Sequence, residues 1–140
     1  MVTLTVDGKR IQVNSGSTVL EAARIAGINI PTLCYHPELR PEGRCRVCLV
    51  EVENAKTLVA SCTYPVSEGM VVKTNTQRVR EARRVVVELL LSDHPADCLT
   101  CDRNNNCELQ KLAHDVGIRE IRFPGEKQSW SKDTDNPVLI

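Results

Sequence analysis

The fold and the chemistry of this chain both depend on one stretch, Gly43-Arg44-Cys45-Arg46-Val47-Cys48-Leu49-Val50-Glu51-Val52. Cys45 and Cys48 form a C-x2-C pair, a spacing that lets two thiolates from one tight turn bind the same metal. Cys34 precedes the pair in a long loop, and Cys62 follows it at the end of a predicted strand. Four thiolates suit either zinc or an iron–sulfur cluster.

A second group of potential metal ligands follows at residues 94–107, with the spacing H-x3-C-x2-C-x5-C. Its members are His94, Cys98, Cys101 and Cys107. The chain has seven cysteines, an odd number that excludes a complete disulfide framework. Four cysteines in the first group and three in the second account for all of them, with His94 as the eighth ligand. Metal or cluster ligation is therefore the leading interpretation.

Other interpretations of these residues stay open. A free cysteine is often a small buried hydrophobic residue, although scattered core cysteines rarely fall into two groups that each contain C-x2-C. Structural zinc accepts four thiolates, or three thiolates with one imidazole. The outlying ligands of the first group resemble ferredoxin spacing more than paired zinc knuckles. His94 alone could cap a helix C-terminus, but the cysteines after it favour ligation, whereas His36 and His114 are expected to be solvated.

The composition is that of a folded chain without an excess of either charge. The 140 residues suit one domain with a small appendage, and 18 basic side chains balance 18 acidic ones. Nucleic-acid binding is disfavoured, because it uses an excess of Lys and Arg to contact phosphates. No apolar run is long enough to predict a membrane span, and the first residues lack signal-peptide features. We expect a cytoplasmic chain that does not itself span a membrane.

Local patterns predict a small α+β sheet domain over residues 1–75. Apolar alternation over residues 2–13, interrupted by Asp7-Gly8, predicts a β-hairpin with a primed turn. Thr18 and Glu21 have capping-box spacing and begin a helix over residues 19–26, which Gly27 ends. A long loop is predicted over residues 29–46, where no period is sustained. Further strands are predicted over residues 49–52, 57–60 and 70–74.

Helices are predicted after this domain. Thr74 and Gln77 have capping-box spacing, and apolar residues then recur at helical intervals to residue 91. The helix is expected to stop at His94-Pro95, because the residue before a proline is driven out of the α region. A short helix is predicted over residues 107–116. The predicted division is a domain at 1–75, a second at 76–123, and an irregular tail at 124–140 that leads into further domains absent here.

Several of these stretches resemble one family of redox proteins. The first cysteine group is similar to the [2Fe–2S] domain that opens the large iron–sulfur subunit of respiratory complex I. Similar domains open the catalytic subunit of NAD(P)-linked [FeFe]-hydrogenase and NAD-dependent formate dehydrogenase. Residues 98–110 resemble the [4Fe–4S] site of these proteins, and together with residues 117–123 they look most similar to the hydrogenase branch. The other stretches that carry the resemblance are Cys34-Tyr35-His36-Pro37, residues 43–52, Ser61-Cys62, residues 68–72, residues 88–91 and residues 94–98.

The resemblance implies a fold and two cofactors. The fold is α+β, with a β-grasp [2Fe–2S] ferredoxin-like domain followed by a helix and a small [4Fe–4S] domain. The implied ligands of [2Fe–2S] are Cys34, Cys45, Cys48 and Cys62, and those of [4Fe–4S] are His94, Cys98, Cys101 and Cys107. Asn105 stands where the family usually has Gly, and Asn tolerates a positive φ better than most residues.

The function that the resemblance implies is a relay of single electrons, with no catalytic centre within these residues. Electrons would enter from iron–sulfur subunits that bind flavin and NAD(P)H, and leave toward a catalytic module in the same or another chain. A multimeric [FeFe]-hydrogenase, electron-bifurcating forms included, fits best. The alternatives are an NAD-dependent formate dehydrogenase, a complex I relay, a self-contained ferredoxin-like carrier and a zinc-stabilised interaction module.

Overall fold

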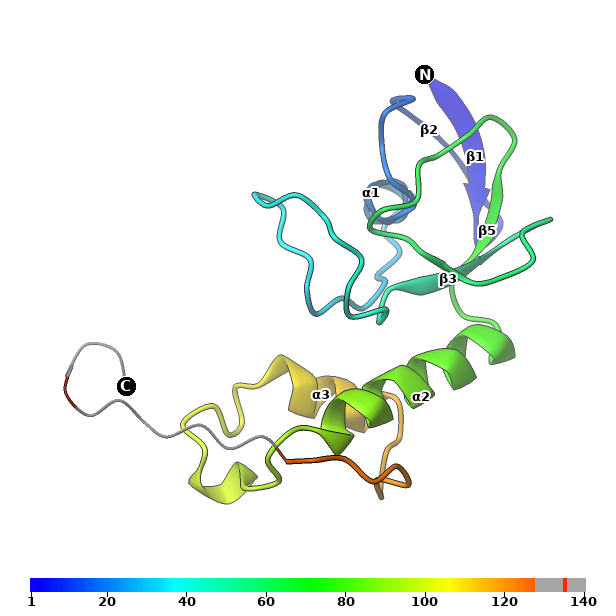
Figure 1. The fold of residues 1–140 in the computed structure, drawn as a ribbon. Helices are drawn as coiled ribbons and strands as arrows, with labels where there is room; N and C mark the ends of the chain where they lie inside the picture. The colour runs from blue at the N-terminus through cyan, green and yellow to red at the C-terminus, as the bar shows by residue number, and fades with distance from the viewer. Residues whose placement is uncertain (128–134, 136–140) are drawn as a thin grey trace.

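A five-stranded mixed sheet forms the N-terminal half of the protein, and a helical part follows it (Figure 1). The computed structural model describes residues 1–127 and residue 135. The strands are β1 (Val2–Val6), β2 (Lys9–Val13), β3 (Leu49–Val52), β4 (Val59–Ala60) and β5 (Val71–Lys73), in the spatial order β2-β1-β5-β3-β4. β1 and β5 run parallel, and the other neighbouring strands are antiparallel. The α+β prediction is confirmed.

The first hairpin forms as its sequence predicts. β1 pairs with β2 from Val2 opposite Val13 to Val6 opposite Lys9. Asp7 and Gly8 connect the strands with φ angles of 46° and 82°. Positive φ at both central residues is what a type I′ turn requires, and its twist matches that of the strands.

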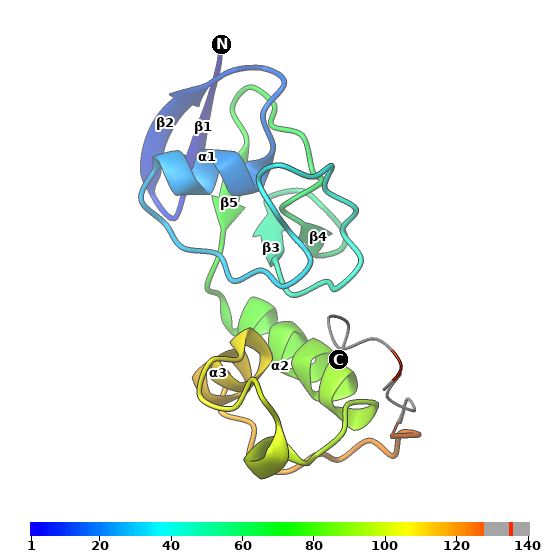
Figure 2. The same ribbon diagram turned by 90° about the vertical axis from the view of Figure 1, so that its left-hand side faces the viewer.

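Helix α1 (Val19–Ile25) covers one face of the sheet (Figure 2). The Thr18 side chain accepts a hydrogen bond from the Glu21 amide, and the Glu21 carboxylate accepts one from the Thr18 amide, so the predicted capping box is present. Gly27, with a φ of 71°, follows the C-cap as expected. Buried residues from α1 and from β1, β3 and β5 form the main hydrophobic core.

The segment between α1 and β3 is a loop, as predicted, with no helix or strand over residues 29–46 of the described chain. β3 and β4 form a second hairpin, in which Leu49 pairs with Ala60. β4 is shorter than the predicted 57–60, because the chain bends at residues 56–57 before it pairs. β5 is likewise shorter than the predicted 70–74.

Helix α2 (Gln77–Ser92) begins two residues later than the predicted cap implies. Its N-cap is Thr76, whose hydroxyl accepts a hydrogen bond from the Val79 amide at 3.2 Å. Thr74 is held instead by Asp7, which accepts bonds from its amide at 2.8 Å and from its hydroxyl. The capping prediction at Thr74 was therefore wrong, because a contact distant in sequence occupies that side chain.

The C-terminal part packs two helices side by side (Figures 1 and 2). A short 3-10 helix, η1 (Cys98–Thr100), precedes α3 (Glu108–Asp115), which confirms the helix predicted near residues 107–116. A second hydrophobic cluster joins the cysteine loop to α2 and α3 through the buried side chains of Val47, Val87 and Leu112. Most of the predicted tail, 124–140, lies outside the described residues. Among the helices described, none combines the length and the apolar character needed to cross a bilayer.

Candidate metal centres

The hairpin of β3 and β4 places two predicted ligands next to each other. Because Leu49 pairs with Ala60, the residues before β3 and after β4 are neighbours. The Ser61 amide donates a 3.1 Å hydrogen bond to the Cys48 carbonyl. Cys48 and Cys62 are each only 1% exposed, so the sheet holds both thiols away from water.

Electrostatics show which of the other cysteines lies near this pair. Burial, a hydrogen bond with Cys48, and the negative charges of Cys48 and Cys34 raise the pKa of the Cys62 thiol to about 12. A hydrogen bond from the Gly43 backbone acts in the opposite direction. Cys34, Cys48 and Cys62 are therefore close enough to interact, and Cys34 is the exposed member of the three.

The loop before Cys48 has an unusual backbone. Gly43 and Arg46 have φ angles of 63° and 58°, which is the left-handed region. A Cβ at Gly43 would lie 3.2 Å from the Thr63 side chain, so the loop also closely approaches the segment that follows β4. Left-handed residues turn successive amides toward a common point and create anion-binding concavities. The conformation suits a loop that surrounds a negatively charged group.

Cys45 occupies a different side of the same turn. It packs with the second hydrophobic cluster and lines a hollow with Arg46 and with Val86, Leu89 and Leu90 of α2. Cys45 thus lies toward the helical part, three residues from Cys48.

Arg83 of α2 connects this turn to the helical part. It is 8% exposed, and its guanidinium donates to the carbonyls of Val47 at 3.0 Å and Leu49 at 2.9 Å. Burial lowers the pKa of Arg83, and the charge of Cys48 acts in the opposite direction. Arg83 was not predicted from the sequence, although Val79, Arg83 and Val87 are spaced four apart on the face of α2 that is buried.

All four members of the second predicted group line one small hollow. His94, Cys98, Cys101 and Cys107 surround it, together with Arg103, Asn104 and Gln110 among others. The prediction that these residues lie together is consistent with this placement, while their role as ligands stays a prediction.

The N-terminus of α3 organises the end of this group. Cys107 is the N-cap, and its sulfur accepts a 3.5 Å hydrogen bond from the Gln110 amide. The Gln110 side chain accepts from the Asn105 amide at 3.1 Å and donates to the Asn104 side chain at 3.0 Å. Asn105 has a φ of 64°, which confirms that the turn survives with Asn in place of Gly.

The segment after α3 returns to the C-terminal end of α2. Arg122 donates from its backbone and side chain to Glu88, which is 1% exposed, at 2.6 to 3.1 Å. These hydrogen bonds hold the pKa of Glu88 below its ordinary value. The Lys127 ammonium donates to the carbonyls of Leu91 at 3.0 Å and His94 at 2.8 Å. The segment therefore fixes the backbone that carries His94.

The donor chemistry fits two iron–sulfur clusters. Within the described residues, no three His, Cys, Asp or Glu side chains meet around a single ion. The members of the second group, three cysteines and a histidine, line one hollow. In the first group of four cysteines, Cys34, Cys48 and Cys62 interact with one another, and Cys45 lies on the helical side of the same turn. Both groups are sets that such clusters accept, since Cys ligation is usual and His can replace Cys.

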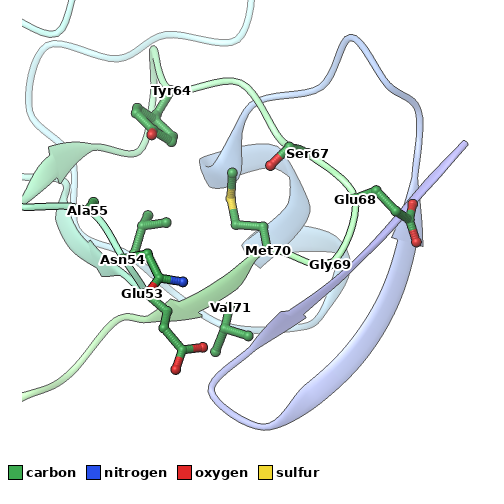
Figure 3. Close-up of a pocket in the computed structure, with 10 residues that line it drawn as sticks. Glu53, Asn54, Ala55, Tyr64, Ser67, Glu68, Gly69, Met70 and Val71 are labelled. Atoms are coloured by element: carbon green, nitrogen blue, oxygen red, sulfur yellow. The ribbon is translucent and has the colours of Figure 1, made fainter.

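A further hollow has a volume of about 330 Å³ (Figure 3). It is bounded by the β3–β4 turn and by the loop before β5, with Tyr64, Met70 and Glu53 among its lining residues. It contains none of the predicted ligands, so it is separate from both candidate centres.

Comparison with protein families agrees with this donor chemistry. Residues 1–77 match the family described as the 2Fe-2S iron-sulfur cluster binding domain. The chain belongs to this family. Residues 83–122 of this iron–sulfur chain match a second description, the NADH-ubiquinone oxidoreductase-G iron-sulfur binding region. The predicted family, the ferredoxin-like fold and the two kinds of cluster are thus confirmed.

Named relatives include hydrogenase and complex I subunits. The iron–sulfur chain is 49% identical over 148 residues to the NADP-reducing hydrogenase subunit HndD of Solidesulfovibrio fructosivorans, covering 99% of this chain and 25% of that protein. It is 50% identical over 140 residues to the mitochondrial NADH-ubiquinone oxidoreductase 78 kDa subunit of Neurospora crassa, covering 99% and 19%. The chain therefore spans about a quarter or less of these relatives.

A solved structure has the same architecture. The crystal structure of an NAD+-reducing [NiFe]-hydrogenase in the H2-reduced state superposes with a TM-score of 0.88 at 34% identity. The match covers 97% of this chain and 57% of that one. The arrangement of the sheet and helices is therefore shared with a chain of an NAD+-linked enzyme.

Proposed function

We propose that this iron–sulfur chain relays single electrons between two clusters. Residues 1–75 hold [2Fe–2S] through Cys34, Cys45, Cys48 and Cys62. Residues 76–123 hold [4Fe–4S] through His94, Cys98, Cys101 and Cys107. When bound, each cluster supplies a one-electron redox centre whose potential depends on its ligands, hydrogen bonds and exposure.

The side chains of the chain prepare these sites in distinct ways. Cys48 and Cys62 are buried, which excludes water from one side of the first site, whereas Cys34 is exposed. Ligation requires thiolates, so the high pKa of Cys62 makes cluster loading release a proton. A neutral His94 contributes one negative charge less than a thiolate, which favours the reduced form of the second centre.

The observation that supports a relay most directly is the shared packing of the two donor groups. Val47, between Cys45 and Cys48, packs against Val87 of α2 and Leu112 of α3. α2 leads to His94, and α3 begins after its N-cap Cys107. One hydrophobic cluster thus fixes the first donor group relative to both ends of the second, as electron transfer over a constant distance requires.

The partners are proposed from the relatives. Electrons would come from iron–sulfur subunits that bind flavin and NAD(P)H, and would pass to a catalytic module in the same or another chain. We favour a multimeric [FeFe]-hydrogenase, electron-bifurcating forms included. The identities of 49% to a hydrogenase subunit and 50% to a complex I subunit do not separate these two uses. The cytoplasmic location also stays a prediction.

Anaerobic reconstitution of the chain tests this function. Iron and acid-labile sulfide are quantified, and electron paramagnetic resonance (EPR) is recorded on the reduced protein. His94→Ala is expected to remove the [4Fe–4S] signal and leave the [2Fe–2S] signal. Cys48→Ala is expected to do the reverse, because each substitution removes a ligand of one centre only.

His114→Ala is the matched control for the histidine substitution, because His114 is exposed on α3 and lies outside both groups. It should leave both signals unchanged. A colourless protein that binds zinc and no iron would overturn the proposal in favour of a zinc-stabilised module. Unchanged spectra in His94→Ala would show that the second ligand set is wrong.

A further inference from the structure

Arg83 makes contacts that packing alone does not require. Its Nε donates to the Val47 carbonyl at 3.0 Å, and its Nη2 donates to the Leu49 carbonyl at 2.9 Å. A third, longer contact of 3.5 Å reaches the Thr74 carbonyl, just after β5. The guanidinium therefore binds backbone carbonyls on both sides of Cys48. Its planar, forked arrangement of N–H donors is suited to two acceptors at once.

Among the described residues, no carboxylate forms an ion pair with Arg83. In the part of the chain that the structure describes, its hydrogen bonds all go to backbone carbonyls. A buried charge usually has an ionic partner. The two carbonyls that accept most closely from Arg83 belong to the residues on either side of Cys48, so this cation is placed beside a predicted cluster ligand.

Adding an electron to the first centre adds negative charge next to this cation. At an effective dielectric constant of about 20, a unit charge about 12 Å away shifts a one-electron equilibrium about tenfold, and a nearer charge shifts it more. Exposed charges are screened by solvent and salt, so they shift this equilibrium much less. The other arginines of α2, Arg78, Arg80 and Arg84, are exposed.

We propose that Arg83 is a positioning and charge-tuning residue for the [2Fe–2S] centre, which holds the Cys48 turn and favours the reduced cluster. The inference rests on the proposed function, because it takes Cys48 as a ligand. It assigns to α2 a second role beside leading the chain to His94: the middle of the helix sets the potential of the first centre, and its C-terminus lies two residues before a predicted ligand of the second.

A potentiometric titration of the full chain, followed by EPR, tests the inference. Arg83→Met and Arg83→Gln both remove the charge, and Gln retains a hydrogen-bond donor. At the midpoint potential of the wild-type first centre, both variants are expected to hold about tenfold less reduced relative to oxidised cluster. For one electron this equals a shift of about 59 mV to more negative potential. The second centre should not move.

Two further variants separate charge from structure. Arg83→Lys keeps the charge without the fork and should titrate closer to wild type than Arg83→Met. Arg84→Met removes a neighbouring exposed arginine and should change neither centre. If Arg83→Met loads only the second centre while Arg83→Gln, which lacks the charge but retains a donor, loads both, the positioning role is supported.

The results distinguish the two proposals. Variants that load both clusters and titrate within twofold of wild type would overturn the role of Arg83 and leave the relay intact. A wild-type chain without a [2Fe–2S] signal would instead overturn the proposed function, and the inference with it.

Discussion

Gly125→Ala should damage the second centre without touching any of its ligands. A Cβ at Gly125 would lie 2.3 Å from the Ser92 carbonyl oxygen and 2.5 Å from its carbon. Real Cβ contacts below 3.0 Å essentially never occur, so the segment must move by about 0.7 Å or more. The obstacle is a helix backbone, which cannot rotate aside as a side chain can. Forced overpacking of this kind typically costs about 1–3 kcal/mol.

The displacement would act on His94 through the neighbouring lysine. Lys127 lies two residues beyond Gly125 and donates to the carbonyls of Leu91 and His94. When the segment moves away, α2 loses a cation at its C-terminus, where positive charge is favourable. The backbone of His94 loses its tether at the same time. We expect weaker loading of [4Fe–4S] and unchanged loading of [2Fe–2S].

Amide hydrogen exchange and EPR measure the two consequences. A loss of about 1–3 kcal/mol in local stability corresponds to roughly 5- to 150-fold faster exchange over residues 122–127. Gly16→Ala is the matched control, since a Cβ there meets nothing within 4 Å and its φ is not in the left-handed region. If Gly125→Ala exchanges and loads like Gly16→Ala, the reasoning about this contact is refuted.

Three further predictions concern other parts of the two sites. In the metal-free chain, alkylation at pH 8 followed by peptide mass spectrometry should label the exposed Cys34 quickly and Cys62 far more slowly, because burial raises the pKa of the Cys62 thiol to about 12 and leaves little of it as thiolate. Equal labelling rates would contradict this. Asn105→Ala should cost about 1 kcal/mol in a denaturant titration and Asn105→Gly should not, because the φ of 64° is unfavourable for Ala. Glu88→Gln should speed hydrogen exchange of the Arg122 amide at neutral pH, because it removes the charged carboxylate that this amide binds. In the wild type, exchange of this amide should become faster only as the pH falls below 4.5 toward the lowered pKa of Glu88.

The parts of the fold that the sequence predicts are those specified by neighbouring residues. The first hairpin depends on Asp7-Gly8, and α1 depends on Thr18 and Glu21, all within a few positions of the elements they define. The pairing of β1 with β5 joins Thr5 to Val71, which no local pattern indicates. A non-local contact also explains the wrong N-cap prediction at α2, because the side chain of Thr74 is bound by Asp7 of the first hairpin.

In the candidate sites too, the residues that could be predicted are those grouped by a local sequence pattern. Spacing along the chain was enough to group His94 with Cys98, Cys101 and Cys107, because all four belong to one short segment. Arg83 and Glu88 lie in a helix that contains many charged residues, so from sequence they resemble solvated side chains. Only the packed structure shows that both are buried and which groups they bind.

The two buried charges of α2 explain why one helix can serve both sites. Arg83 binds the turn of the first donor group, and Glu88 binds Arg122 in the segment that tethers His94. Arg83 and Ser92 lie nine residues apart on α2, about 14 Å along its axis at 1.5 Å per residue. A helix of this length is stiff, so attachments at its middle and its end set the separation of the two donor groups. Substitutions that loosen either attachment should therefore slow electron transfer between the clusters even where both still load.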